Sequence, residues 1–189
     1  MKLNQAPIPL LNPYEDLFQL LLGQDPQLFL SSGSISSIRK KLIWAYSWAI
    51  PNSEGIHAIS RYSPLVEWGA GTGYWAWLLS QTGAQVLAFD REPQQRPHWY
   101  PIERGSETVL AQYSEHALLM CWPSFESEMA SLALDAYQGK SVIYVGEWNG
   151  RTADRVFHQK LKTSWKQVNE IEIPRWPGFL DRIFFFNRL

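Results

Sequence analysis

Three glycines at alternate positions, Gly69, Gly71 and Gly73, stand in the segment 64–79, which reads "PLVEWGAGTGYWAWLL". An apolar run with an acid, Glu67, precedes them, and the residues that follow favour a helix. Glycines at a turn from a strand into a helix let the backbone adopt positive φ angles and let a ligand approach without meeting a Cβ atom. Free N–H groups at the start of the helix attract a negatively charged group. The spacing therefore predicts a ligand-binding loop.

The order of these glycines disfavours two common phosphate-binding loops. A dinucleotide-binding turn has the pattern G-x-G-x-x-G, whereas this segment reads G-x-G-x-G and has Tyr74 where the third glycine would stand. A P-loop ends in Gly-Lys-Ser or Gly-Lys-Thr, and neither ending occurs here. A nicotinamide-dependent oxidoreductase is therefore the weaker of the possible functions.

A second acid suggests what the loop binds. The apolar run 85–90, "QVLAFD", ends in Asp90, seventeen residues after Gly73. A carboxylate at the end of the second strand can accept hydrogen bonds from both hydroxyls of a ribose. A nucleoside that carries an amino acid instead of a diphosphate fits the shorter glycine loop, and S-adenosylmethionine answers that description.

The segment 64–91 resembles the class I, Rossmann-like S-adenosylmethionine-dependent methyltransferases. "LVEWGAGTG" is similar to the first motif of that family and "VLAFD" to its second-strand acid, and in outline the resemblance extends over residues 36–189. It implies a sheet of seven strands that closes with an antiparallel hairpin, with S-adenosylmethionine as the cofactor and methyl transfer as the activity.

The resemblance also implies roles for individual residues. The glycine loop would wrap the amino-acid part of the cofactor, Glu67 would hold its ammonium group, and Asp90 would hold its ribose. Arg91 would lie over the adenine, and the segment containing Gly105 would contact the adenine edge. The full set predicted to contact the cofactor is Glu67, Gly69, Ala70, Gly71, Thr72, Gly73, Asp90, Arg91, Ser106 and Cys121. The simpler interpretations are an ion-paired or solvated Glu67 and a surface Arg91.

The acceptor is expected near the ends of the fourth and fifth strands, because ligands bind outside the carboxyl ends of parallel strands. Related amino-group methyltransferases often have Asn or Asp at the end of the fourth strand, where this sequence has Cys121, followed by Trp122. That substrate class is therefore not implied, and a module that binds the cofactor without catalysis remains an alternative. Trp122 is predicted to stack on the acceptor or on the sulfonium; the alternative is a Trp122 that covers the core.

Holding the two reactants in line is the main task in methyl transfer, so a catalytic base is optional. Candidates for a base are His98, His116, Glu147 and His158. Glu147 is preferred because it ends the fifth strand, although an ion pair with Arg151 or Arg155 would also explain it. His116 should lie at the far end of the fourth strand, and His158 is expected in a surface or capping role. Cys121 is disfavoured as a covalent nucleophile.

Around these residues, short apolar runs alternate with helical stretches, as in a parallel α/β sheet. We expect a doubly wound, mostly parallel sheet of seven strands with a C-terminal antiparallel hairpin and an N-terminal helical extension. The expected strands are 64–68, 85–90, 99–103, 117–122, 141–147, 166–176 and 181–189, and the expected helices are 12–23, 36–50, 53–62, 73–82, 124–138 and 152–165. Asn12 and Ser53 are the predicted caps of the first and third helices.

The N-terminal part, 1–60, is predicted to be a helical extension or lid, and 61–189 to be the methyltransferase domain, the two together forming one compact body. The lid would carry Trp44, Tyr46 and Trp48, whose simpler interpretation is core packing. An aromatic, nearly uncharged cleft favours a small, partly apolar acceptor.

Composition narrows the possible partners. The chain has 17 Lys and Arg residues against 18 Asp and Glu residues, a net charge of −1, which disfavours nucleic acid and anionic membrane surfaces as partners. A single cysteine excludes an internal disulfide and a multi-cysteine zinc site, and no metal is expected. The sequence has no run of about eighteen apolar residues and no typical signal peptide, so we expect a cytoplasmic protein. The oligomeric state is left open.

Overall fold

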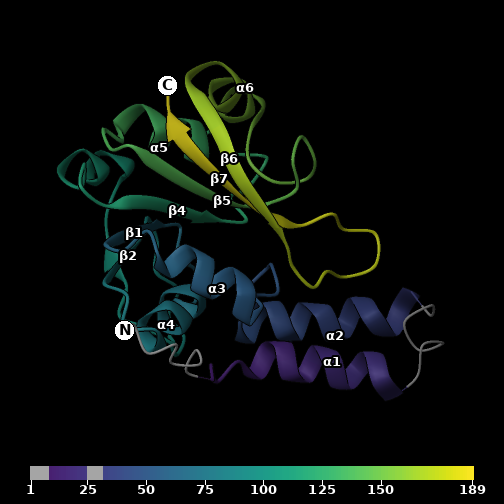
Figure 1. The fold of residues 1–189 in the computed structure, drawn as a ribbon. Coiled ribbons are helices and arrows are strands. Elements are labelled where there is room, and N and C mark those ends of the chain that lie inside the picture. The colour runs from purple at the N-terminus through teal and green to yellow at the C-terminus, as the bar shows by residue number, and fades with distance from the viewer. Residues whose placement is uncertain (1–8, 25–31) are drawn as a thin grey trace, which may run out of the picture.

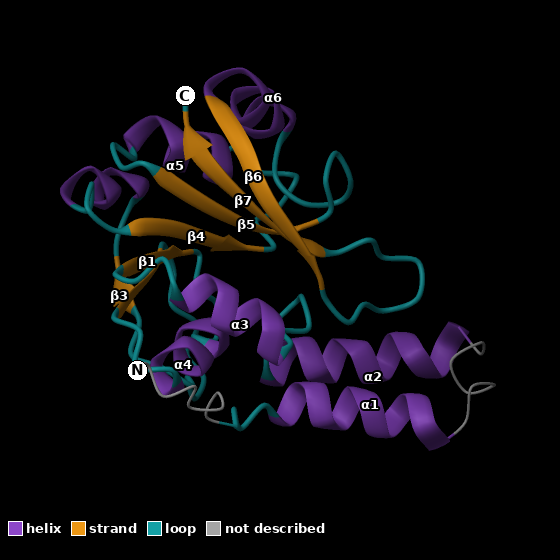
Figure 2. Cartoon of the chain, in the orientation of Figure 1, coloured by secondary structure: helices purple, strands orange, loops and turns teal. Residues whose placement is uncertain are grey.

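The computed structural model describes residues 9–24 and 32–189, which form a seven-stranded sheet with helices on both faces (Figures 1 and 2). The strands lie in the order β3-β2-β1-β4-β5-β7-β6. Their bounds are β1 Leu65–Trp68, β2 Val86–Asp90, β3 Glu103–Arg104, β4 Ala117–Cys121, β5 Ser141–Gly146, β6 Trp165–Glu172 and β7 Arg182–Arg188. The first five strands pair in parallel, and β7 runs antiparallel to both of its neighbours. The predicted fold class is confirmed.

Helices cover the two faces of this sheet. Their bounds are α1 Pro13–Gln24, α2 Ser32–Ala45, α3 Ser53–Ser60, α4 Tyr74–Gln81, α5 Met129–Ala136 and α6 Arg155–Ser164, with a 3-10 helix at Glu107–Gln112. Figure 1 shows α5 and α6 on one side of the sheet and α3 and α4 on the other, with α1 and α2 lying side by side beyond α3. None of the helices in the described part of the chain is long and apolar enough to cross a membrane.

The central strands are apolar on both faces because both faces are covered. Along β4, Leu119 faces the core beneath α1, α3 and α4, whereas Leu118 and Met120 face the core beneath α5 and α6. In contrast, β6 lies at the edge of the sheet and is mostly exposed. The continuous apolar runs of the sequence therefore mark strands that are buried on both sides.

The structure corrects several predicted boundaries. The helix expected at 36–50 ends at Ala45, because the carbonyl groups at its end accept side-chain hydrogen bonds from Thr72, Arg96 and Trp99 instead of continuing the helix. The helix expected at 124–138 begins only at Met129, and the strand expected at 99–103 is reduced to two residues. The predicted 1–60 extension is partly outside the described residues.

Two predicted caps have different outcomes. Asn12 caps α1 as expected, since its Oδ1 accepts the backbone N–H of Glu15 at 3.3 Å. The cap of α3 is Asn52, not Ser53, because the Oδ1 of Asn52 accepts the N–H of Gly55 at 2.9 Å. Two adjacent residues with good capping side chains cannot be told apart from the sequence.

Asn12 also ties the first helix to the rest of the molecule. Its Oδ1 accepts a hydrogen bond from the Tyr74 hydroxyl at 2.7 Å, and its Nδ2 donates to the carbonyl of Pro51 at 2.8 Å. The side chain is buried, with 3% of its surface exposed. The N-terminal helices therefore join the sheet through buried polar contacts as well as apolar packing.

We expect Asn12→Ala to lower the free energy of unfolding by about 2–3 kcal/mol, because it removes a cap and leaves the buried Tyr74 hydroxyl without its acceptor. Urea unfolding of the two proteins measures the loss. Asn169→Ala, the same change at an exposed position on β6, is the control and should stay within about 0.5 kcal/mol of the wild type. An equal effect of both substitutions would contradict this role for Asn12.

Candidate functional site

The three glycines have different structural roles at the turn from β1 into α4. All three have positive φ, +75° at Gly69, +58° at Gly71 and +74° at Gly73. A Cβ added at Gly73 would meet the backbone of Tyr100 at 3.0 Å, and one added at Gly69 would meet the Met129 methyl group, whereas one at Gly71 would meet nothing within 4 Å. Gly69 and Gly73 therefore allow close packing, and Gly71 leaves the backbone open to a ligand.

Asp90, at the end of β2, faces this loop. Its Oδ2 accepts the backbone N–H of Gly71 at 3.0 Å, and its Oδ1 accepts the N–H of Glu92 at 3.0 Å. The carboxylate thus lies beside the open backbone at Gly71, where the sequence placed a ribose-binding acid. Because a carboxylate has about four acceptor positions, these two bonds leave capacity for hydroxyl groups.

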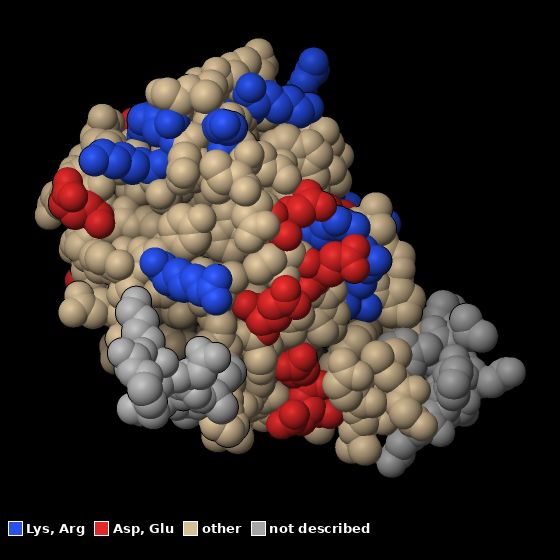
Figure 3. Space-filling view, viewed as in Figure 1, with Lys and Arg blue, Asp and Glu red and all other residues tan. Residues whose placement is uncertain are grey.

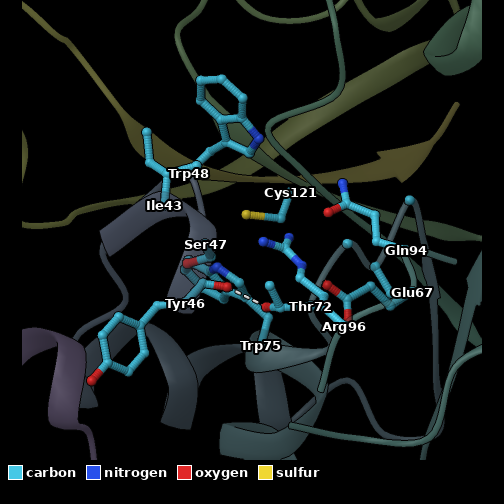
Figure 4. A pocket seen from close by; sticks show the side chains of 13 residues that line it. Ile43, Tyr46, Ser47, Trp48, Glu67, Thr72, Trp75, Gln94, Arg96 and Cys121 are labelled. Atoms are coloured by element: carbon cyan, nitrogen blue, oxygen red, sulfur yellow. Dashed lines mark hydrogen bonds between the residues drawn. The ribbon is translucent and has the colours of Figure 1, made fainter. Parts of the chain in front are cut away.

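A pocket lies between the glycine loop and the segment that follows α2 (Figure 4). It encloses about 70 Å³. Its lining residues are Ile43, Tyr46, Ser47, Trp48, Glu67, Gly69, Ala70, Gly71, Thr72, Trp75, Gln94, Arg96 and Cys121. Small-molecule pockets usually have about 300–1,000 Å³, so a nucleoside requires the covering residues to shift. The pocket brings together Glu67, Cys121 and the whole glycine loop except Gly73, and Asp90 adjoins it through Gly71.

Glu67 is the most unusual side chain of this pocket. It is 1% exposed, and its Oε2 has no hydrogen-bond partner in the described part of the chain. Burial raises the pKa of Glu67 to about 8, and the nearby Asp90 charge adds to this rise. A buried polar atom without a partner costs free energy unless a ligand satisfies it. The carboxyl group is thus suited to bind a cationic group.

The end of β4 presents Cys121 and Trp122. Cys121 lines the pocket, and burial raises the pKa of its thiol well above the usual value, which makes it a poor nucleophile. Trp122 stacks on Trp48, with ring centroids 4.8 Å apart, and its Nε1 donates to Asp181 at 2.6 Å. Since Trp48 lines the pocket, the stacked pair extends its aromatic wall.

Sequence reasoning missed Asp181 and Arg39 beside this wall. Asp181 is 2% exposed, and burial raises its pKa to about 6. The Arg39 guanidinium lies 4.0 Å from the centroid of Phe179 and 5.8 Å from that of Trp122. Asp181 and Phe179 belong to the loop between β6 and β7, far from the sequence motifs, so the sequence gives no signal that they belong to the site.

The structure does not bring Glu147 to the pocket. Its Oε2 accepts the backbone N–H of Arg151 at 2.9 Å, and its Oε1 accepts that of Leu180 at 2.8 Å. Neither Arg151 nor Arg155 forms an ion pair with it among the described residues. These contacts give Glu147 a role in holding two loops together, and its buried carboxylate does not line the pocket.

Other predicted residues also lie outside the pocket lining. Arg91 forms an ion pair with Glu107 at 2.8 Å, and Ser106 is exposed and bonds to Thr108. The predicted surface position of His158 is wrong: the ring is buried, with its Nε2 2.9 Å from the Thr152 carbonyl, and burial lowers its pKa. Of the other histidines, His98 is exposed, and His116 precedes β4 at the opposite edge of the sheet, as expected.

The aromatic residues predicted to lie on a lid, Trp44, Tyr46 and Trp48, differ in their surroundings: some pack on the core and some line the pocket. Tyr46 stacks on Tyr14, with centroids 5.1 Å apart, and also lines the pocket. Trp48 lines the pocket and is 47% exposed, whereas Trp44 is 62% exposed and lies under the Arg96 guanidinium. The segment after α2 thus both packs on the core and covers the pocket.

The raised pKa of Glu67 predicts a pH-dependent stability. Because the folded protein holds this proton up to about pH 8 and the unfolded chain releases it near 4.5, stability falls as the pH rises between these values. From pH 6 to pH 8, the free energy of unfolding should fall by about 2 kcal/mol more in the wild type than in Glu67→Gln. Urea unfolding of both proteins across this pH range measures the difference. Asp181 and His158 titrate in both proteins, so parallel curves would refute the assignment to Glu67.

No protein-family model matches the sequence, and no curated protein matches it. Among solved structures, the chain is similar to a point variant of MtNAS in complex with S-adenosylmethionine, with a TM-score of 0.51 and 14% identity over 93% of this chain and 71% of that one. It also matches magnesium protoporphyrin IX methyltransferase (ChlM) from Synechocystis PCC 6803 with bound SAM, with a TM-score of 0.45 and 13% identity over 93% of this chain and 91% of that one. A third match is M. capricolum TrmK in complex with S-adenosylhomocysteine, with a TM-score of 0.47 and 9% identity over 72% of this chain and 69% of that one. The likeness to MtNAS agrees with the strand order and the glycine loop. The chain therefore shares the Rossmann-like α/β fold of MtNAS, a protein whose solved structure holds S-adenosylmethionine.

Proposed function

We propose that the protein is an S-adenosylmethionine-dependent methyltransferase that acts on a small molecule. The observation that carries this proposal is the buried carboxyl group of Glu67, which lacks a partner at its Oε2 and lines the same pocket as the open backbone at Gly71. The fold and the orientation of Asp90 toward Gly71 support it. These residues fit an adenosyl amino acid, since an acid is present for its ammonium group and another for its ribose.

In this assignment, Glu67 binds the ammonium group, Asp90 accepts from the ribose hydroxyls, and the loop through Gly71 lies along the ligand. S-adenosylmethionine supplies a methyl group that its sulfonium makes electrophilic. The chain contributes orientation and exclusion of water, because the segment after α2 covers the pocket and its residues Tyr46 and Trp48 line it.

The acceptor would approach along the aromatic wall formed by Trp48 and Trp122. Trp48 is partly exposed, and the two rings are nearly parallel, at 7°. Flat aromatic surfaces favour a planar, partly apolar acceptor. Figure 3 shows acidic and basic side chains mixed over the centre of the visible face, and the net charge of −1 gives little attraction for a large polyanion. Both features favour a small molecule over a nucleic acid.

Binding is tested by thermal unfolding and calorimetry with S-adenosylmethionine and S-adenosylhomocysteine. At a ligand concentration of about 100 times Kd, we expect stabilisation by about 2.7 kcal/mol. NADH serves as the control ligand and should give no shift. A protein that neither adenosyl ligand stabilises would refute the proposal.

Turnover is tested by incubating the protein with methyl-labelled S-adenosylmethionine and a cell extract, followed by separation of small molecules from macromolecules. The proposal expects label in a small-molecule product. Label in RNA or protein would overturn the acceptor assignment, and binding without any labelled product would favour the module that has lost catalysis.

Replacing Gly71 by Leu should weaken S-adenosylhomocysteine binding by at least about 100-fold, because the side chain enters the pocket. Gly83→Leu is the matched control, since Gly83 also has positive φ, +84°, and nothing within 4 Å of its added Cβ, but lies after α4 outside the pocket lining. In both variants the free energy of unfolding should fall by a similar amount, about 1–2 kcal/mol. Calorimetric titration separates them, and equal affinities would contradict the placement of the ligand at Gly71.

A further inference from the structure

The pocket holds a second ionisable side chain, Arg96, which comes from the loop between β2 and β3. Its Nη1 donates a hydrogen bond to the carbonyl of Trp44, and its guanidinium carbon lies 5.4 Å from the centroid of the Trp44 ring. Its Nε is buried without a hydrogen-bond partner, and no acid within the described ranges forms an ion pair with it. Figure 4 shows the guanidinium group projecting toward the middle of the pocket, near Cys121.

Glu67 and Arg96 therefore line one pocket without forming an ion pair with each other. No ion pair joins them, and each keeps one buried polar atom without a partner, Oε2 of Glu67 and Nε of Arg96. Burying two such groups separately is unfavourable unless a ligand supplies the missing partners. The complementary ligand has a cation for Glu67 and an anion for Arg96, as a zwitterionic α-amino acid does.

The charges of the proposed ligand leave one arrangement. S-adenosylmethionine has two cationic groups, the ammonium and the sulfonium, and a single anionic group, the carboxylate. A guanidinium beside either cation would be repelled, so the carboxylate is the one charged group of the ligand with which Arg96 can pair. A guanidinium also matches a carboxylate geometrically, because its N–H groups can donate in parallel to both oxygens.

We propose that Arg96 binds the carboxylate of the amino-acid moiety of the adenosyl ligand while Glu67 binds its ammonium group, so that the pocket selects ligands with an intact α-amino acid. This inference rests on the proposed function. It assigns a role to Arg96, a residue that lies outside the sequence motifs. Arg96 also holds the carbonyl of Trp44 at the end of α2, so the carboxylate and the segment that covers the pocket share one side chain.

Three ligands that differ only at the amino-acid end test this inference. S-adenosylhomocysteine has both the ammonium and the carboxylate, its decarboxylated analogue S-adenosyl-3-thiopropylamine keeps the ammonium alone, and 5′-methylthioadenosine lacks both. Calorimetry gives the Kd of each for the wild type, for Arg96→Gln and for Arg61→Gln. Arg61 is the control, because it is exposed at the end of α3 and does not line the pocket.

We expect the wild type to bind S-adenosylhomocysteine about 10- to 100-fold more tightly than the decarboxylated analogue. Arg96→Gln should raise the Kd of S-adenosylhomocysteine by a similar factor and leave the Kd of each of the other two ligands within about threefold of the wild-type value. Arg96→Lys should restore part of the loss, because it restores the charge without the planar fork. Glu67→Gln should instead weaken both ligands that have an ammonium group and spare 5′-methylthioadenosine.

Two outcomes would overturn the inference while the proposed function stands. An Arg96→Gln protein that loses affinity equally for all three ligands would show that Arg96 only fastens the cover, and one that binds S-adenosylhomocysteine like the wild type would show that it does not contact the carboxylate. A wild-type protein that binds none of the three ligands would instead refute the proposed function, and this inference with it.

Discussion

The site depends on one buried carboxyl group that its own fold does not fully satisfy. Glu67 is the third residue of β1, and its neighbours in register are Ala88 on β2 and Leu119 on β4, both buried and apolar. An apolar side chain at this position would be buried at no electrostatic cost, whereas a carboxyl group there is stabilised in its protonated form. A carboxyl group at such a position becomes favourable when a ligand supplies its missing partner, so β1 contains the strongest sign of function in the described part of the chain.

The elements around Glu67 create a pocket that is closed by polar contacts as well as by aromatic packing. Three side chains on the glycine loop and on the following β2–β3 loop donate to carbonyl groups at the end of α2 and just beyond it. They are Thr72, Arg96 and Trp99. These bonds satisfy a helix end and at the same time hold the covering segment over the glycine loop. A ligand larger than this pocket of about 70 Å³ would have to displace these bonds.

The parts of this site that the sequence predicts are those built from neighbouring residues. The glycine loop and Asp90 follow from spacing, because a strand, a tight turn and a helix leave few alternative conformations. The sequence does not predict contacts between distant segments. The Trp122 indole meets Asp181, and the Glu147 carboxylate meets the backbone of Leu180, only after the β6–β7 loop folds back over the ends of β4 and β5. The preference for Glu147 as a base failed to anticipate its backbone bonds for the same reason.

The same distinction explains why the residues proposed to bind the cofactor can be recognised in the sequence, whereas those proposed to face the acceptor cannot. The proposed cofactor residues come from one continuous stretch between β1 and β2, where changing a glycine strains the backbone. The proposed acceptor wall combines Arg39 of α2, Trp48 of the segment after it, Trp122 at the end of β4 and Phe179 of a distant loop. None of these four residues lies within a strand, so proteins that share this fold can differ at such positions and act on different acceptors. The proposed acceptor would therefore be recognised through tertiary contacts, and both Arg39 and Asp181 lie against that aromatic wall.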